Sequence, residues 1–211
     1  MKTLLIISIA LMSMIPGHAQ KTIKIDNIND QQIKTVFQSN KRDGFYGSIS
    51  SGYSPIDGKH GLVFSSRGSW IMDHWFAVGI GGTGFVNNVD QLSADLSGYL
   101  ASDETGLAGG YGGIYLEPML GPLKPVHLSF PVLFGAGGLS SYTTYHHTYY
   151  DIEDYFFVIE PGIELEVNFT RWLRVAAFTT YRFTSDINIE NVNSNALRTW
   201  SAGLNFKVGL F

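Results

Sequence analysis

Long segments of this chain alternate apolar and polar residues one by one. A two-residue period places one set on each face of a β-strand, so these segments predict sheet with one apolar and one polar face. The clearest example is 154–168, whose apolar set is Phe157, Ile159, Pro161, Ile163, Leu165 and Val167. The polar set between them is Glu160, Gly162, Glu164, Glu166 and Asn168.

Eight segments with sheet character follow one another. They are 44–54, 60–71, 75–87, 107–120, 126–139, 154–168, 172–185 and 196–211. Most are longer than strands of soluble proteins and suit a tilted crossing of a bilayer, which takes about 9–11 residues. A soluble β-sandwich is the alternative, with the apolar face as its core.

The connections between these segments differ in length in a regular way. Short ones are expected at 72–74, 121–125 and 169–171, long ones at 88–106, 140–153 and 186–195, and a medium one at 55–59. Transmembrane barrels carry short turns at the periplasmic end and longer loops outside. The pattern predicts an all-β fold: an eight-stranded antiparallel up-and-down transmembrane β-barrel over residues 44–211.

The first residues indicate export. Lys2 precedes an apolar run from Leu4 to Ile15, and Gly17-His18-Ala19 offers small residues before a cleavage site. The run is too short for a spanning helix, so residues 1–19 are expected to be a signal peptide. Residues 20–43 would form a polar periplasmic lead-in, either disordered or with a short helix that begins at Asp30.

Composition narrows the function classes. The chain has no cysteine, which excludes disulfides and thiolate metal sites. Its net charge of −4 makes nucleic acid an unsuitable partner. The 24 glycines, 14% aromatic residues and 15% charged residues suit a barrel with a tightly packed lumen and aromatic membrane edges.

The export signal, the eight strands, the three tight turns and the ending Asn205-Phe206-Lys207-Val208-Gly209-Leu210-Phe211 carry a resemblance. The chain resembles the small OmpA/OmpX-like outer-membrane β-barrel proteins. The resemblance implies a Gram-negative cell outer membrane, lipid and lipopolysaccharide around the barrel, and Phe211 as the signal for the barrel-assembly machinery. Phe211 departs from the family pattern, because Phe206, Val208 and Leu210 share the lipid-facing parity and Phe211 does not.

Charged residues fall on the polar face of the strands and would lie in the lumen. This set is Arg67, Glu117, Glu160, Glu164, Glu166, Arg174, Arg182 and Lys207. An eight-stranded barrel is just wide enough for its interior to be filled with side chains, and buried charges must be paired. We expect a lumen charge network, with Glu166 opposite Arg174; a gated proton or ion path is the alternative.

His127 and Ser129 are weak catalytic candidates. A His-x-Ser pair resembles the base and nucleophile of outer-membrane lipid A deacylases, which would make the chain a lipid-modifying enzyme. His127 lies just after a short turn, however, and so at the periplasmic end, whereas lipid A lies in the outer leaflet. The alternative is a structural contact between His127 and Glu117.

The long connection expected at 140–153 is rich in aromatic and histidine residues. Its candidates for recognition of an extracellular protein or glycan are Tyr142, Tyr145, His146, His147, Tyr149 and Tyr150. Tyrosine gives a large contact area for little entropy. Packing of this loop on the barrel rim is the alternative, and a metal site at the two histidines is another.

The three long loops carry acidic residues and no Lys or Arg, which suits solubility or weak divalent-cation binding. No EF-hand, phosphate-binding loop or zinc motif occurs, and we expect neither a cofactor nor a metal. The sequence thus favours a non-porous outer-membrane protein with a structural or surface-interaction role and no enzymatic activity. A lipid A-modifying enzyme and a small ion channel remain as alternatives.

Overall fold

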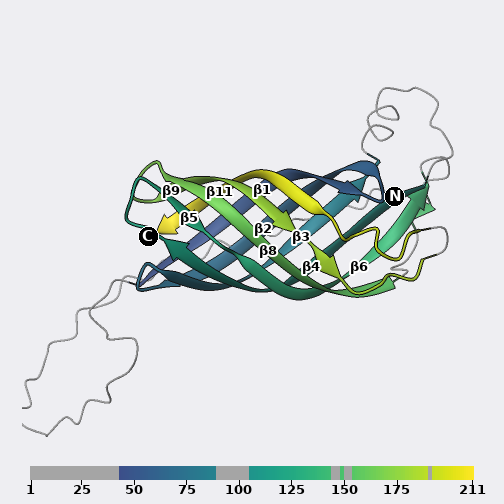
Figure 1. Ribbon diagram of the computed structural model, residues 1–211, viewed down its shortest axis with the longest axis horizontal. Coiled ribbons are helices and arrows are strands. Elements are labelled where there is room, and N and C mark those ends of the chain that lie inside the picture. Colours follow the sequence, from purple (N-terminus) through teal and green to yellow (C-terminus); the bar gives the residue numbers. More distant parts are fainter. Residues whose placement is uncertain (1–42, 89–104, 144–147, 150–153, 190–191) are drawn as a thin grey trace, which may run out of the picture. The chain divides into compact units, whose positions relative to one another are not determined.

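The alternating segments form one closed antiparallel sheet in the computed structural model of the chain (Figure 1). The structure describes residues 43–88, 105–143, 148–149, 154–189 and 192–211. The expected signal peptide and nearly all of the expected lead-in lie outside these residues, as do most of the first two long connections. Among the described residues, no helix is long and apolar enough to cross a bilayer.

Eight strands build the wall. Six are single elements: β1 (Gly44–Ile56), β2 (Lys59–Met72), β3 (Phe76–Asn87), β4 (Thr105–Leu120), β8 (Asp154–Asn168) and β11 (Trp200–Leu210). The fifth strand consists of β5 (Val126–Ser129) and β6 (Val132–Thr143), and the seventh of β9 (Leu173–Tyr181) and β10 (Phe183–Thr184). A further short element, β7 (Thr148–Tyr149), pairs with the end of β6.

The two interruptions leave the strand register intact. β5 pairs with β8 at Ser129↔Glu164, and β6 continues the same register at Val132↔Pro161. Pro131 lies between β5 and β6 and has no backbone N–H to donate, which explains a local break in the hydrogen-bond ladder. The fifth strand therefore runs from 126 to 143 as one element.

The sheet closes between the first and the last strand. β1 pairs with β2 on one side and with β11 on the other, at Gly44↔Ile71 and Phe45↔Leu210. Each of the eight strands thus has two antiparallel neighbours, and the prediction of a closed up-and-down barrel is confirmed. The β-sandwich alternative is wrong, because a sandwich needs two sheets.

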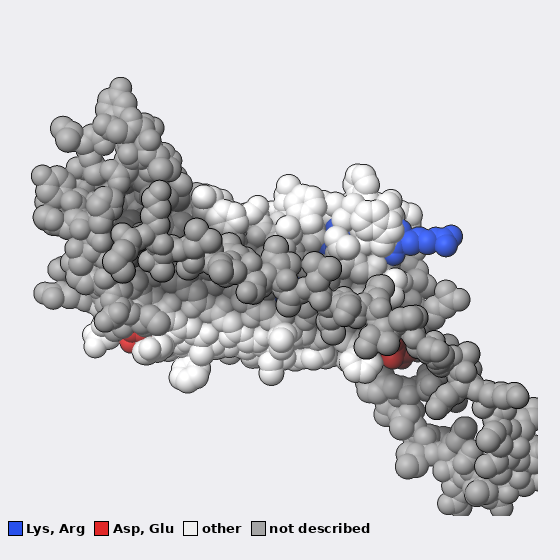
Figure 2. Space-filling view, turned by 180° about the vertical axis from the view of Figure 1, so that it is seen from behind, with Lys and Arg blue, Asp and Glu red and all other residues white. Residues whose placement is uncertain are grey.

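The two faces of the wall differ as the alternation predicts. In β8, Phe157 is 75% exposed, whereas Glu166 is fully buried. No outward-facing position of the eight described strands carries Asp, Glu, Lys or Arg. Figure 2 shows the described wall as an almost uncharged surface with basic side chains at one end. An apolar outer wall around a charged interior suits a bilayer and not water.

One end of the barrel, the short-turn end, carries three tight connections. Residues 73–75 include Asp73 and His74 at positive φ (54° and 65°), which suits a hairpin turn. Residues 121–125 and 169–172 join β4 to β5 and β8 to β9. These connections were expected to be short, and they are.

The opposite end, the long-loop end, departs from the expectation in its first connection. β1 and β2 are joined by the two-residue turn Asp57-Gly58 with φ of 51° and 72°, so the medium loop expected at 55–59 is wrong. Both residues adopt the left-handed conformation that a tight hairpin turn requires, and Gly58 does so without a side-chain penalty.

The mouth at the long-loop end is filled by the segment between β10 and β11. Its residues Ile187, Ala196 and Leu197 are buried in an apolar cluster with wall residues that include Phe85 and Phe156. The backbone N–H of Asp57 donates to the carbonyl of Ala196 (3.2 Å) and ties the segment to the first hairpin. The last strand was expected to begin at 196; it begins at Trp200, because 196–197 fold inward as part of this cluster.

The short-turn end is closed by a smaller cluster. Tyr46, Ile71, Ala77 and Met119 are buried there, and Phe211 packs against them. The Phe211 ring stacks on Tyr46 with centroids 5.9 Å apart. Odd-numbered positions of β11 face inward, so the parity that sets Phe211 apart from Leu210 directs its ring toward the lumen.

Facing glycines allow β4 and β6 to approach each other. Gly113 and Gly135 are register partners. A Cβ on Gly135 would lie 2.2 Å from the carbonyl oxygen of Gly112, and a Cβ on Gly113 would lie 2.1 Å from that of Phe134. The close approach of these two strands thus depends on the absence of side chains at these positions.

Candidate functional site: the charged interior

The expected lumen residues all point into the barrel, and all but Arg182 come from five strands. Arg67 comes from β2, Glu117 from β4, Lys207 from β11 and Arg174 from β9, and β8 supplies the glutamates 160, 164 and 166. Arg182 lies between β9 and β10 and is fully buried. Two groups of contacts result, a large one near the short-turn end and a smaller one nearer the long-loop end.

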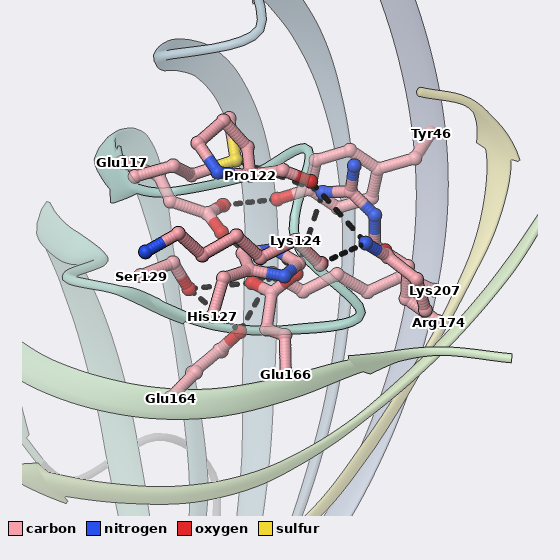
Figure 3. Close-up of polar contacts among 12 residues, drawn as sticks. Tyr46, Glu117, Pro122, Lys124, His127, Ser129, Glu164, Glu166, Arg174 and Lys207 are labelled. Atoms are coloured by element: carbon pink, nitrogen blue, oxygen red, sulfur yellow. Dashed lines mark hydrogen bonds and ion pairs between the residues drawn. The ribbon is translucent and has the colours of Figure 1, made fainter.

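Lys207 forms the centre of the larger group. Its Nζ lies 2.5 Å from Glu117 Oε1, 2.6 Å from Glu164 Oε2 and 2.5 Å from Glu166 Oε1. Its side chain is 1% exposed. Figure 3 shows the labelled glutamates gathered around this part of the lumen. Three carboxylates within hydrogen-bond distance of one buried ammonium form charge-assisted bonds, the strong class of hydrogen bond.

Two guanidinium groups complete the larger group. Arg67 Nη2 donates to both oxygens of Glu164, at 2.7 and 2.9 Å, and lies 3.7 Å from Glu117. Arg174 Nη1 reaches Glu166 at 3.4 Å. The hydroxyl of Tyr46 donates to Glu117. Three cations thus face three carboxylates, and the group is balanced in formal charge.

The expected pairing of Glu166 directly opposite Arg174 is wrong. The register places Glu166 opposite Ala176, and Arg174 opposite Asn168. The turn spans four residues, because the amides of Phe169 and Thr170 both donate to the carbonyl of Leu173. Arg174 still reaches Glu166, but diagonally along the inner face of the barrel.

The smaller group lies nearer the apolar cluster that fills the mouth at the long-loop end. Arg182 Nε lies 3.3 Å from Glu160 Oε2 and donates to the Tyr111 hydroxyl at 3.1 Å. The Tyr111 hydroxyl in turn donates to Glu160. The Arg182 guanidinium also lies 5.5 Å from the centre of the Phe85 ring, within cation–π range. This pair is balanced as well.

The cluster of three glutamates is not suited to a metal ion, because the ammonium of Lys207 occupies its centre. Glu117, Glu164 and Glu166 offer oxygens within 4.8 Å of one another, close enough for a common ligand. The ammonium of Lys207 already lies against all three. A divalent ion would have to displace it and leave a buried Lys without a partner, which is strongly unfavourable.

His127 and Ser129 face the same interior and are buried. Ser129 Oγ donates to Glu166 Oε1 at 2.6 Å, and His127 Nε2 lies 3.0 Å from Glu166 Oε2. The expected contact of His127 with Glu117 is wrong, because the register places His127 directly opposite Glu166. A nucleophilic serine needs a bond to its base and access to substrate. Ser129 instead donates to a carboxylate inside the barrel wall.

The aromatic loop candidates lie mostly outside the described residues. Tyr145, His146, His147 and Tyr150 are not described, and Tyr142 and Tyr149 are described only as backbone partners in a short ladder. The rim that is described carries Arg198, whose Nη2 lies 2.6 Å from Asp186 Oδ1. The long-loop end is therefore less uniformly acidic than its loops suggest, since Arg198 belongs to the loop and not to the last strand.

Sequence reasoning missed the neutral partners of the network. Tyr46 and Tyr111 donate to carboxylates, and Asn205 Nδ2 donates to Glu164 at 3.1 Å. All three lie at inward-facing positions of strands. Their parity was a usable signal, because a hydroxyl or amide that faces a charged lumen needs a partner there.

Comparison with known proteins gives a match in structure and none in sequence. No family model and no curated protein matches the chain. Neisserial surface protein A (NspA) superimposes with a TM-score of 0.55 at 10% identity, over 79% of this chain and 95% of that one.

The match to NspA and the closed antiparallel sheet show that the chain has the fold of the small outer-membrane β-barrels. A second solved structure is Ail, the attachment invasion locus protein of Yersinia pestis, in complex with the heparin analogue sucrose octasulfate. It is 14% identical over 78% of this chain and 98% of that one, with a TM-score of 0.46. The same protein in a phospholipid bilayer nanodisc has a TM-score of 0.37 at 16% identity, over 77% of this chain and 98% of that one.

Proposed function

We propose that this protein is a non-conducting anchor in a cell outer membrane that presents its loops to a partner outside the cell. The packing of the described interior is the observation that carries the proposal. A balanced ion-pair network fills the lumen near the short-turn end, and apolar residues close the other mouth. What such a barrel can offer to the outside is its loop end.

Two kinds of partner suit that end. Tyrosines in the long connection 140–153 would give rigid contact area to an extracellular protein or glycan. Lipopolysaccharide surrounds the barrel in such a membrane, and acidic residues at the rim would approach its phosphates through divalent cations. The barrel-assembly machinery would be a partner during insertion, with Phe211 in the recognition signal.

A channel is the weaker alternative. A permeating ion would have to separate Lys207 from three carboxylates and pass the apolar cluster around Leu197, which is fully buried. A lipid A-modifying enzyme is weaker still, since Ser129 is fully buried and bonded to Glu166. Both candidate catalytic residues, His127 and Ser129, are buried.

A loop exchange tests the proposal. Residues 142–150 are replaced by a Gly/Ser segment of equal length, and purified protein in nanodiscs is tested for binding to host-matrix proteins and to a glycan array. We expect the native protein to bind a ligand that the exchanged protein does not bind. The control is the substitution Asp57→Asn in the turn between β1 and β2. It leaves the aromatic loop intact, and this variant should bind as the native protein does.

The shift in gel mobility on heating, typical of folded barrels, must persist in both variants. The interaction role is contradicted if the native protein binds nothing, or if the exchanged protein binds equally well. The enzyme alternative is tested by comparing the lipid A of cells with and without the protein. A difference in lipid A structure that disappears in Ser129→Ala would favour the enzyme.

A further inference from the structure

A small cavity lies in the middle of the lumen, between the two charged groups. Its volume is about 40 Å³, and its lining includes Ser48, Ser50, Ser65, Arg67, Thr180 and Asn205. Glu164 of the larger charged group and Glu160 of the smaller one also line it. The cavity therefore separates the two ion-pair layers.

Three buried polar atoms of the lining have no hydrogen-bond partner among the described residues. They are Arg67 Nε, Thr180 Oγ1 and Asn205 Oδ1. Arg67 has a side-chain exposure of 6%, and Asn205 is 3% exposed. Most buried polar groups in proteins are hydrogen-bonded, so three such atoms around one cavity indicate a bound partner.

The amide of Asn205 is oriented by its neighbour. A carboxylate accepts hydrogen bonds and cannot donate them, so the Asn205 group that lies 3.1 Å from Glu164 must be Nδ2. Oδ1 is then the atom that remains to accept. Arg67 is fixed in a similar way, because Nη2 contacts Glu164 and Nε is left to donate.

The three atoms together define the chemistry of the ligand. Arg67 Nε can only donate, Asn205 Oδ1 can only accept, and Thr180 Oγ1 can do both. A metal cation would leave the Arg67 N–H unpaired and be repelled by it, and an anion would leave Asn205 unpaired. A small neutral molecule that both donates and accepts satisfies all three.

We propose that this cavity is a water site that links the two ion-pair layers of the barrel. Each water needs roughly 10–15 Å³ of such volume and two to four polar partners, so the cavity holds about three. These waters bond Arg67, Thr180 and Asn205 and use the serine hydroxyls as further partners. The apolar cluster at one end and the Lys207 group at the other separate them from bulk water.

Removing the Thr180 hydroxyl should change the stability in opposite directions, depending on whether the cavity contains water. Thr180→Val removes the hydroxyl and keeps the shape. If water bonds the hydroxyl, the substitution loses a bond, and the unfolding equilibrium constant rises about threefold to tenfold. If the cavity is dry, the same substitution removes an unpaired buried group, and the protein becomes more stable.

Unfolding is measured by urea titration of the full chain in lipid vesicles. Thr180→Ser keeps the hydroxyl and should stay closer to the native midpoint than Thr180→Val does. Thr179→Val, on the exposed outer face, is the matched control and should show no loss. Ser129→Ala removes a hydroxyl outside the cavity lining that donates to Glu166 Oε1 at 2.6 Å, and it must be destabilising, which shows that the assay detects the loss of a buried hydrogen bond.

A second measurement sees the water directly. Nuclear Overhauser cross-peaks from long-lived water to the amides around Thr180 and Asn205 should appear in the native protein and weaken in Thr180→Val. Absence of these cross-peaks, or a gain in stability in Thr180→Val, overturns the water site. A shift in the urea midpoint when sodium chloride replaces choline chloride would overturn it in favour of a bound cation.

Discussion

Replacing Lys207 by methionine removes the centre of the interior network at little change in side-chain length. Glu164 keeps Arg67, and Glu166 keeps Arg174, but Glu117 is left with a guanidinium at 3.7 Å as its nearest cation. Three carboxylates then face two cations. Breaking a buried ion pair by removing one partner costs about 3–5 kcal/mol, and we expect a loss near 3 kcal/mol because both arginines remain.

The assay is urea unfolding in lipid vesicles followed by tryptophan fluorescence. All four tryptophans report on the outer wall: Trp70, Trp75, Trp172 and Trp200 are 45–60% exposed there. Lys124→Met in a short turn is the matched control, because Lys124 is exposed and its loss should change the free energy of unfolding by less than about 0.5 kcal/mol.

A second substitution tests the charge argument itself. Lys207→Met combined with Glu117→Gln restores the balance, with two cations against two carboxylates, and should recover part of the lost stability. The reasoning is refuted if Lys207→Met unfolds at the native urea midpoint, or if the double variant is no more stable than the single one. The coupling between the two sites is read from the double-mutant cycle.

Three further predictions concern packing, the His-x-Ser pair and the last residue. Gly135→Ala should destabilise the barrel by about 1–3 kcal/mol, since its Cβ meets backbone, whereas Gly68→Ala on the open outer face should be neutral; equal effects in urea titrations would contradict the role of inward glycines. His127→Ala and Ser129→Ala should leave lipid A unchanged by mass spectrometry while lowering the urea midpoint. Phe211→Ala should lower stability by about 1–2 kcal/mol, because the ring lies 3.9 Å from a buried guanidinium carbon; an unchanged midpoint would show that this ring does not close the lumen.

Strand positions and their faces could be predicted from the sequence because the two-residue period of a strand is fixed by geometry. Glu164 and Glu166 had to face opposite to Leu165, whatever the partner strand. The outward-facing positions of the described strands carry no Asp, Glu, Lys or Arg, and the two faces of these strands therefore differ clearly in the sequence. The start and end of β8 were predicted to the residue.

Register and loop packing could not be predicted in the same way. The offset between Glu166 and Arg174 depends on a four-residue turn whose shape is set by backbone bonds and by the Thr170 hydroxyl, which accepts from the amides of Trp172 and Leu173. The segment 196–199 continues the apolar pattern of a strand, yet Leu197 fills the mouth of the barrel. Both outcomes depend on contacts with residues distant in sequence.

The charge network, too, could be predicted only in part from the sequence. Parity predicts which charged residues are inside, but the choice of partners follows from strands that meet across the lumen. Lys207 and Glu117 are 90 positions apart. The convergence of three carboxylates on one ammonium depends on the curvature of the closed sheet, which the residue pattern alone does not specify.

The central claim is that the barrel is sealed, and single-channel recording in a planar bilayer tests it most directly. Purified, heat-modifiable protein should give no current steps above the background of the empty bilayer in molar potassium chloride at either polarity. Reproducible steps that appear with the folded protein and vanish with a heat-denatured sample would contradict the sealed interior and favour a channel.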